Sequence, residues 1–327
     1  MTTFVDLFCG GGFGARGAVR GGGVPLLGLD AWELATKTYQ HNFPQADVIT
    51  DFIENVDISS LGNEYRPDVL LTSPECTAHS IAKGAKKGSE KSRETALGIL
   101  PWLESMEPRW LIVENVNRMK KWDRHNDLVQ TIEEFGYKVS DLYLNSAEFG
   151  SAQARKRMFL VCDKEGTSVT REQLLGMSST SLLSAKDIIN WQANYKSTPL
   201  YKDGRAQATI DRAERGISAL GRGVNFLIVY YGSDYGGGWQ TLDAPLRTVT
   251  TVDRFGLITW KDDVPYLRML QPDELLKAMG GGHEHVLPYG NRREKVKLCG
   301  NGVCSDVMTS IFLWIDYQMS KTHSPAA

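Results

Sequence analysis

The sequence lacks the features that mark a membrane protein, a disulfide-bonded secreted protein or a general nucleic-acid binder. No apolar run approaches the roughly 20 residues that a membrane helix needs, and no basic segment precedes an apolar one near its start. The 5 cysteines form no tight CxxC pair, which argues against a disulfide framework and a zinc site. A formal net charge of -2 leaves nucleic-acid contacts to local basic patches. We therefore expect a cytoplasmic protein with reduced thiols, no metal and no membrane partner.

What is present is the composition of an ordinary globular protein. The 327 residues, 42% hydrophobic and 23% charged, suit one large domain with a smaller one appended. Strand and helix patterns alternate up to about Gly166, after which segments rich in serine, threonine and glycine follow. We find no internal repeat and no low-complexity tract. The sequence thus predicts an α/β domain and, beyond residue 165, a second domain of irregular, partly β structure.

A glycine-rich turn follows the first strand-like segment. Residues 3–8 read as a strand, residues 9–17 are rich in glycine, and a helical pattern comes next. This order brings backbone N–H groups close to a cofactor. Asp30 ends the next strand-like run, about 20 residues beyond the glycines, where a carboxylate can bind a pair of ribose hydroxyls. The alternative for Asp30 is a solvated acid at a strand end.

A cysteine stands where an apolar run ends and a polar loop begins. Residues 67–71 predict a buried strand, so Cys76 comes just past its carboxyl end, where open α/β sheets build their sites. A thiolate nucleophile is the functional interpretation, and a buried small hydrophobic residue is the structural alternative. The loop beyond it could close over a phosphate backbone or be a solvated run of charge. Its basic residues are Lys83, Lys86, Lys87, Lys91 and Arg93.

Two further segments carry charged side chains at the ends of predicted strands. Glu114 directly follows four apolar residues, 110–113. A closed pocket would raise the pKa of Glu114 by desolvation and let it donate a proton, whereas an exposed strand-end acid would do neither. Arg155 and Arg157 stand at alternate positions of an extended segment and would therefore point the same way, toward phosphate, a base or water.

Taken in order, these segments resemble the DNA (cytosine-5)-methyltransferase family over nearly the whole chain. Asp6–Gly12 resembles the first cofactor motif of that family, and Cys76 matches its catalytic cysteine. Glu114-Asn115-Val116 matches its Glu-Asn-Val, and residues 153–157 match its Gln-x-Arg-x-Arg. Residues 268–280 resemble the motif after the target-recognition region, and residues 300–303 the closing Gly-Asn-x-Val.

The resemblance implies a fold and a reaction. It implies a Rossmann-like catalytic domain with a mostly parallel sheet over residues 1–165, which binds S-adenosylmethionine. A smaller target-recognition domain would span residues 166–265, and residues 266–327 would return to the catalytic domain. The substrate would be a cytosine flipped out of double-stranded DNA. We further expect a monomer from a prokaryote or a phage, either solitary or paired with a restriction endonuclease.

The resemblance also implies roles for single residues. Cys76 would add to cytosine carbon 6, Glu114 would protonate N3, and Arg155 and Arg157 would hold the base carbonyl oxygen and the catalytic loop. Cofactor contacts are expected from Phe8, Gly10, Gly12, Asp30, Asp51, Phe52, Pro74, Asn301 and Val303. DNA contacts are expected from Glu75, Ser80, Lys83, Lys86, Lys87, Arg93, Gln153, Arg247 and Arg254.

Three positions depart from the family pattern. Glu75 replaces the second of the two prolines that normally precede the cysteine, and a carboxylate there raises the pKa of the thiol unless it is turned away or paired with a cation. Ala31 follows Asp30 where the family has a large aromatic residue, and Ala96 stands where a larger apolar residue is common. These departures leave open transfer of a modified alkyl group from an unusual S-adenosylmethionine derivative, action on a modified base, and a catalytically silent DNA-binding relative. RNA as the substrate also stays open.

Overall fold

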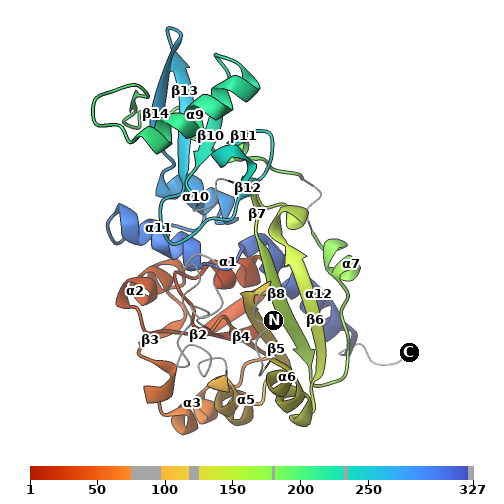
Figure 1. Ribbon diagram of the computed structural model, residues 1–327. Helices are drawn as coiled ribbons and strands as arrows, with labels where there is room; N and C mark the ends of the chain where they lie inside the picture. Colours follow the sequence, from red (N-terminus) through yellow and green to blue (C-terminus); the bar gives the residue numbers. More distant parts are fainter. Residues whose placement is uncertain (75–96, 118–124, 179–180, 232–234, 323–327) are drawn as a thin grey trace.

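The computed structural model describes residues 1–74, 97–117, 125–178, 181–231 and 235–322, and every structural statement below refers to these residues. Figure 1 shows two units, a larger one that contains both ends of the chain and a smaller one above it. The larger unit holds a seven-stranded sheet and the smaller one a five-stranded antiparallel sheet. The predicted α/β fold with a mostly parallel sheet is confirmed.

The large sheet has its strands in the order β3, β2, β1, β4, β5, β8, β6. Neighbouring strands from β3 to β5 are parallel, and β8 is antiparallel to both β5 and β6. The order reverses between β1 and β4, so a crevice opens at their carboxyl ends, where sheets of this kind bind ligands. The strands are β1 (Thr2–Leu7), β2 (Gly23–Asp30), β3 (Asp47–Thr50), β4 (Val69–Thr72), β5 (Trp110–Val116), β6 (Lys138–Asn145) and β8 (Lys156–Asp163).

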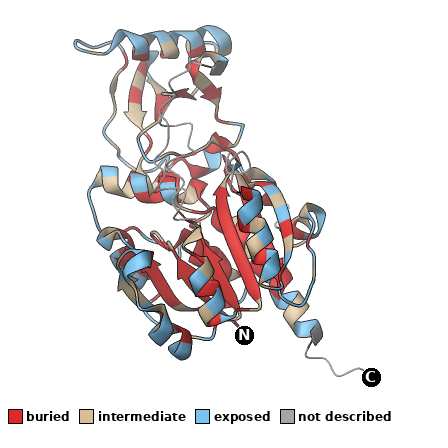
Figure 2. Ribbon diagram, turned by 60° about the horizontal axis from the view of Figure 1, so that its bottom comes forward, coloured by how far each residue is buried: buried red, intermediate tan, exposed pale blue. Residues whose placement is uncertain are grey.

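The central strands are buried on both faces, which explains their unbroken apolar runs. In β4, Val69 and Leu71 join one core while Leu70 joins the other. Figure 2 shows these buried strands between helices whose outer sides are exposed. One face carries α1 (Phe13–Arg20), α2 (Glu33–Asn42) and α12 (Ser305–Thr322), and the other carries α3 (Ile58–Glu64), α5 (Leu100–Met106) and α6 (His125–Glu134).

The last helix of the chain closes the first core. Trp314 of α12 meets Trp110 edge-on at a centroid distance of 5.4 Å, and Phe312 meets Phe4 at 5.4 Å. By length and composition the stretch Arg292–Lys321 would suit a membrane span, but 72% of its apolar window is buried inside the protein. It is therefore a core segment, built from α11 (Arg292–Asn301) and α12.

The sequence predicts a turn over residues 297–303 that opens the final helix, but in the structure helix α11 occupies this segment up to Asn301. The Asn291 side chain accepts hydrogen bonds from Arg293 N and Glu294 N, and the Glu294 carboxylate accepts one from Asn291 N. This capping box starts a helix that buries Val296 and Leu298, and the turn shrinks to the residues after Asn301.

The small unit is more regular than the sequence suggested. Its antiparallel sheet is covered by α9 (Gln207–Leu220), whose Ala213 packs in one cluster with Phe226 and Ile258. The sequence predicts a helix from Arg268 to Met279, but the last strand of the small unit continues to Met269 and the helix begins only at Pro272. The sheet order is β11 (Trp239–Thr241), β10 (Phe226–Val229), β13 (Phe255–Lys261), β14 (Val264–Met269) and β9 (Thr198–Pro199).

Short elements connect the two units. Strands β7 and β12 pair in parallel, with Leu246 opposite Gln153 and Arg247 opposite Ala154. Helix α10 begins at Pro272, a residue that the first helical turn tolerates because its missing N–H would be unsatisfied there anyway. The remaining short elements of the chain are η1 (Ile53–Asn55), η4 (Ser146–Phe149), β7 (Gln153–Ala154), α7 (Arg171–Leu175), α8 (Ala185–Ile188), η5 (Tyr235–Gly238), β12 (Leu246–Arg247) and α10 (Pro272–Ala278).

Candidate cofactor and catalytic site

The glycine turn after β1 wraps tightly into α1. Phe8, Gly10 and Gly12 all have positive φ angles, of 58°, 53° and 83°. Gly12 caps the helix, and a Cβ atom there would lie 2.6 Å from the Phe43 ring, so both backbone and space require glycine. Gly12 N also donates to Cys9 O at 3.0 Å. The turn thus curls back at the carboxyl end of β1, as the sequence predicted.

Asp30 lies directly beside this turn. Its Oδ2 accepts a hydrogen bond from Gly10 N at 2.9 Å, and its Oδ1 accepts one from Trp32 N at 2.8 Å. The carboxylate therefore fixes the shape of the turn and the start of α2. A carboxylate oxygen can accept more than one hydrogen bond, so these two bonds are compatible with a role at the ribose. Binding of ribose hydroxyls by Asp30 stays a prediction.

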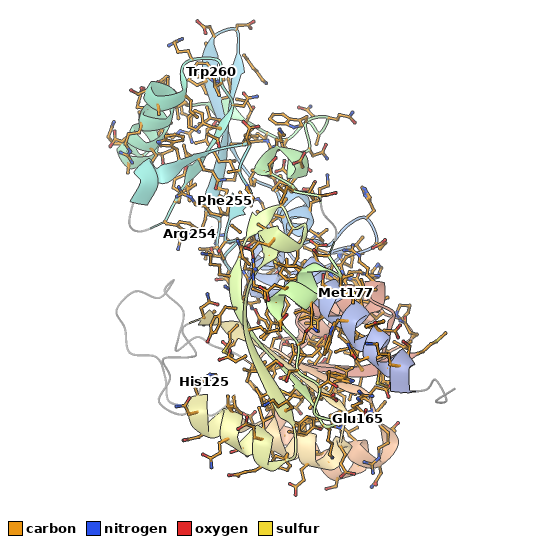
Figure 3. All side chains as sticks on the ribbon, turned by 90° about the vertical axis from the view of Figure 1, so that its right-hand side faces the viewer. His125, Glu165, Met177, Arg254, Phe255 and Trp260 are labelled. Carbon is orange, nitrogen blue, oxygen red and sulfur yellow. The ribbon has the colours of Figure 1, made fainter. Side chains whose placement is uncertain are left out.

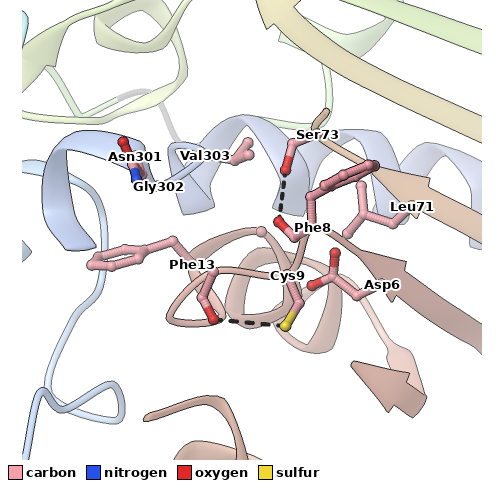
Figure 4. A pocket seen from close by; sticks show the side chains of 11 residues that line it. Asp6, Phe8, Cys9, Phe13, Leu71, Ser73, Asn301, Gly302 and Val303 are labelled. Atoms are coloured by element: carbon pink, nitrogen blue, oxygen red, sulfur yellow. Dashed lines mark hydrogen bonds between the residues drawn. The ribbon is translucent and has the colours of Figure 1, made fainter. Parts of the chain in front are cut away.

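A pocket opens where β1 and β4 separate (Figure 4). Ser73 joins the two strand ends, because its Oγ donates to Phe8 O at 3.1 Å and its N donates to Leu7 O at 3.3 Å. The end of α11 closes the opposite wall. The lining residues are Asp6, Phe8, Cys9, Gly10, Phe13, Gly14, Leu71, Ser73, Asn301, Gly302 and Val303. Four of the predicted cofactor residues, Phe8, Gly10, Asn301 and Val303, thus meet in one pocket.

Asp6 is a pocket residue to which the sequence analysis gave no role. It is only 3% exposed, and its Oδ2 has no hydrogen-bond partner among the described residues. Burial, and then the charge of Asp30, raise the pKa of Asp6 well above its ordinary value. An unpaired carboxyl oxygen in a closed wall suits a ligand that brings a positive charge or a donor. The sequence feature that could have pointed to Asp6 is its position as an acidic residue inside the apolar run of β1.

Asp51 and Phe52, which the resemblance places against the adenine of the cofactor, follow directly after β3. Asp51 Oδ1 accepts from Phe52 N and from Asn55 Nδ2, both at 2.7 Å. The Phe52 side chain is 56% exposed, which is unusual for a phenylalanine at the end of a sheet strand. Thr50, the last residue of β3, pairs with Asp30 of β2. Asp51 and Phe52 therefore follow at the same end of the sheet as the glycine turn. Their contact with adenine stays a prediction.

Glu114 is the buried acid at the carboxyl end of β5. Its Oε1 accepts no hydrogen bond, although Arg157 Nε lies 3.2 Å away. Burial raises the pKa of Glu114, and the Arg157 and Arg155 charges oppose that rise without cancelling it. The predicted closed environment of Glu114 is therefore present, and its exposed alternative is excluded.

Strand register explains how Arg157 reaches Glu114. Glu114 pairs with Phe159 and Val116 pairs with Arg157 across the antiparallel β5 and β8. Side chains two residues apart share a face, so Glu114 and Arg157 are diagonal neighbours on one side of the sheet. Arg157 Nη1 also donates to Lys156 O at 2.8 Å, which turns the guanidinium along the strand edge.

The loop with the candidate nucleophile starts beside this pair. Asn115 Nδ2 donates to Pro74 O at 3.3 Å and so ties the end of β4 to β5. Pro74 is the last described residue before that loop. The predicted residues Glu75, Cys76, Ser80, Lys83, Lys86, Lys87 and Arg93 lie outside the described part of the chain.

Gln153 and Arg155 are both buried where the two units join, and the contacts predicted for them with DNA, the base and the catalytic loop stay predictions. Gln153 is fully buried, with its Oε1 accepting from Val249 N at 2.6 Å. Arg155 donates from Nη1 to Val249 O at 2.9 Å and from Nη2 to Gly300 O at 3.0 Å. Arg155 lies between β7, which ends at Ala154, and β8, which begins at Lys156, and its charge acts together with that of Arg157 on Glu114.

The two arginines predicted in the small unit are partly engaged with its backbone. Arg247 Nη2 donates to Trp239 O at 3.2 Å, and Arg254 Nη1 donates to Tyr230 O. Figure 3 shows Arg254 and Phe255 at the end of the small unit nearer to the large one, and Trp260 at the far end. Arg254 therefore lies on the side of the small unit that faces the large one, and its contact with DNA stays a prediction.

Metal ligands and reactive thiols are not evident in the described residues. No group of three or more His, Cys, Asp or Glu side chains in that part of the chain could hold a metal ion. Cys9, Cys162, Cys299 and Cys304 are buried and unpaired with one another. Burial raises the pKa of the Cys9 thiol, so this pocket residue is unsuited to act as a thiolate.

Comparison with known proteins adds independent findings. A profile described as C-5 cytosine-specific DNA methylase matches residues 2–316. The type II methyltransferase M.HgiDI of Herpetosiphon aurantiacus is 27% identical over 163 residues, covering 50% of this chain and 52% of that protein. A tRNA (cytosine(38)-C(5))-methyltransferase of Rattus norvegicus is 27% identical over 165 residues, covering 48% of this chain and 41% of that one. The chain thus spans about half the length of the curated relatives it matches.

A solved structure matches the fold over its full length. The S. pombe Dnmt2 methyltransferase superposes with a TM-score of 0.70 and covers 99% of both chains. Its sequence identity to this chain is 12%, so the likeness concerns the fold alone.

Proposed function

Because this chain belongs to the C-5 cytosine-specific DNA methylase family, we propose that it transfers a methyl group from S-adenosylmethionine to carbon 5 of a cytosine flipped out of duplex DNA. The observation that carries the proposal is the buried Glu114 oxygen, which lies 3.2 Å from Arg157 Nε and accepts no hydrogen bond. An unsatisfied acid at a strand end suits a partner that arrives with the substrate.

S-adenosylmethionine is the cofactor of this family, and the pocket residues fit it. The buried Asp6 oxygen without a partner suits a cationic ligand, and a Cβ atom built on Gly10 would meet nothing within 4 Å, so the turn leaves open space. Asp30 and the exposed Phe52 would contact the ribose and the adenine, and Asn301 and Val303 would close the opposite wall. When bound, the cofactor supplies an electrophilic methyl group on a sulfonium.

The residues of the chain would make cytosine reactive. Carbon 5 of cytosine is a weak nucleophile, so the Cys76 thiolate first forms a bond to carbon 6. The electron pair displaced from the 5,6 double bond moves into the ring, and protonation at N3 leaves an enamine that is nucleophilic at carbon 5. After methylation a base removes the proton from carbon 5, the double bond re-forms, and the bond to Cys76 breaks.

Glu114 would supply the proton at N3. Its raised pKa favours the protonated form that this step needs, and its carboxyl group can also accept from the N4 amino group. Arg157 lies beside it and can hold the base carbonyl oxygen while offsetting charge on Glu114 after the proton has left. The pair therefore supports both recognition and activation of cytosine.

Two classes of nucleic acid are compatible with the relatives, and we propose DNA. The matching family model is named for DNA methylation, and the M.HgiDI relative is named a type II methyltransferase. The relative from Rattus norvegicus is named for tRNA, which makes tRNA the second candidate substrate. We further propose that the protein acts as a monomer in the cytoplasm, alone or beside a restriction endonuclease.

The test is methyl transfer measured on both substrates with the full chain. Duplex DNA and a tRNA transcript are each incubated with S-adenosylmethionine, digested to nucleosides and weighed by mass spectrometry. We expect one methyl group on cytosine carbon 5 in DNA, and Cys76→Ser should abolish it while duplex binding persists. A gain on tRNA only would replace the DNA assignment, and binding without any gain would favour an unusual donor or a silent binder.

A further inference from the structure

Three segments that are distant in sequence converge where the two units join. They are residues 152–155 around β7, residues 246–251 around β12, and the end of α11 at residues 300–303. Leu246 N donates to Ala152 O at 2.8 Å, and Thr248 Oγ1 donates to Ala154 O at 3.0 Å. The small unit is therefore fixed to the large one by hydrogen bonds along its connecting segment.

Arg155 links all three segments through one side chain. It is 5% exposed, and its guanidinium donates to Val249 O at 2.9 Å and to Gly300 O at 3.0 Å. The backbone of Arg155 is also held in place, because its N–H donates a hydrogen bond to Ser146 Oγ at 3.1 Å. A rigid planar fork between two carbonyl groups fixes their separation, which a flexible ammonium group does not do.

The contact between the connecting segment and α11 is direct. A Cβ atom on Gly300 would lie 2.3 Å from Thr250 C and 2.3 Å from Thr251 N, so the two backbones touch. The next residues, Asn301 to Val303, line the cofactor pocket. On the other side, Arg247 belongs to β12 and Arg254 follows the same segment toward the face between the units. A displacement of residues 247–251 would therefore also displace the pocket wall at residues 301–303.

We propose that Arg155 is a positioning residue that couples nucleic-acid binding by the small unit to cofactor binding in the pocket. The inference rests on the proposed function, because it takes DNA and S-adenosylmethionine as the two ligands. Such coupling is reciprocal, so each ligand tightens the binding of the other by the same factor, typically about 5–150-fold. Gln153 supports the same junction, since its Oε1 accepts from Val249 N.

The experiment measures the coupling factor itself. The Kd of S-adenosylhomocysteine, which cannot be turned over, is measured by calorimetry with and without a saturating duplex that the transfer assay has shown to be methylated. We expect the duplex to lower this Kd in the unaltered protein by about 5-fold or more. In Arg155→Lys the ratio should fall toward 1 while each ligand still binds alone.

Arg205→Lys is the matched control. Arg205 also donates to backbone carbonyls, from Nε to Leu200 O at 3.2 Å and from Nη2 to Pro199 O at 3.0 Å, but both lie within the small unit. The Arg205→Lys protein should keep the full coupling factor. If Arg155→Lys does not fold, Thr248→Val removes the hydroxyl that donates to Ala154 O and should lower the ratio in the same direction.

Two outcomes in the variants would overturn the inference. One is an unchanged ratio in a folded Arg155→Lys or Thr248→Val protein, and the other is an equal loss in Arg205→Lys. A ratio of 1 in the unaltered protein would also overturn it while leaving the methyl-transfer assignment intact. Failure of the proposed function is seen separately, as absence of methyl transfer to any duplex.

Discussion

Arg157 Nε lies 3.2 Å from Glu114 Oε1, yet this buried oxygen accepts no hydrogen bond. The arginine charge favours the ionised carboxylate, while burial favours the protonated acid and has the larger effect on the pKa of Glu114. The two residues therefore form an acid that is held close to a cation without being fully neutralised by it. A proton donor for a ring nitrogen needs this balance, since it must both give the proton and tolerate the charge left behind.

Replacing Glu114 should separate chemistry from cofactor binding. Glu114→Gln keeps the size of the side chain but removes the proton donor, so we expect single-turnover methyl transfer to fall by about 10²–10⁴-fold. The affinity for S-adenosylhomocysteine should stay the same, because Glu114 is not among the residues that line the pocket. Rapid-quench measurement with saturating DNA checks the first expectation, and transfer at the original rate would remove Glu114 from the mechanism.

The same substitution should change how stability depends on pH. Because the pKa of Glu114 is raised on folding, the folded state binds this proton more tightly than the unfolded chain, whose glutamate has a pKa of about 4.3. Stability is thus lost as pH rises from that value through the folded pKa. Glu114→Gln removes the loss, so its Tm relative to the unaltered protein should rise with pH and then level off. Parallel Tm curves for the two proteins would contradict this account.

The ionisation of Asp6 should make the affinity for a positively charged cofactor depend on pH. Burial keeps Asp6 protonated to a higher pH than an ordinary aspartate, so its ionisation adds negative charge to the pocket only above that range. The affinity for S-adenosylmethionine, which carries a sulfonium, should rise as Asp6 ionises. S-adenosylhomocysteine lacks that charge and serves as the matched ligand. Calorimetry over a series of rising pH values should show a steeper rise for the sulfonium, and Asp6→Asn should remove the difference between the two ligands.

Asp30 should matter for the shape of the pocket as well as for contact. Asp30→Ala removes two hydrogen bonds from backbone N–H groups to a carboxylate, each worth about 1.5–3 kcal/mol. We expect the affinity for S-adenosylhomocysteine to fall by about 10-fold or more, since about 1.4 kcal/mol corresponds to a factor of ten. Asp57→Ala is the control, because Asp57 accepts from Ser59 N at the start of α3, away from the pocket. An equal affinity loss in both variants would point to general destabilisation.

The sequence predicted the site residues that follow long buried strands. Glu114 could be placed because four apolar residues lead up to it, and Asp30 because its spacing from the glycine turn is characteristic. The backbone contacts of Arg155 could not be predicted, since its partners Val249 and Gly300 are distant in the sequence. The role of Gln153 also depends on contacts with Val249, which no local pattern contains.

The small unit shows where hydrophobic periodicity fails. Helix α9 buries Thr209, Ala213 and Gly216 at helical spacing, but these residues are small or polar, so its buried face carries few large apolar side chains. A Cβ atom on Gly216 would lie 2.2 Å from the Phe226 ring, which shows that a large sheet residue fills the space instead. Such a helix becomes visible only when its partner in the sheet is known.

The junction around Val249 sets a rule for exchanging recognition units between enzymes. The large unit is closed by both ends of the chain, as the bond from Thr2 Oγ1 to Asp316 Oδ1 at 3.2 Å illustrates, and the small unit is inserted between them. A chimera that replaces the small sheet but keeps residues 246–251 retains the hydrogen bonds to Gln153 and Arg155. A cut made inside that segment would break these hydrogen bonds and so remove support from the wall of the pocket that Asn301 and Val303 line.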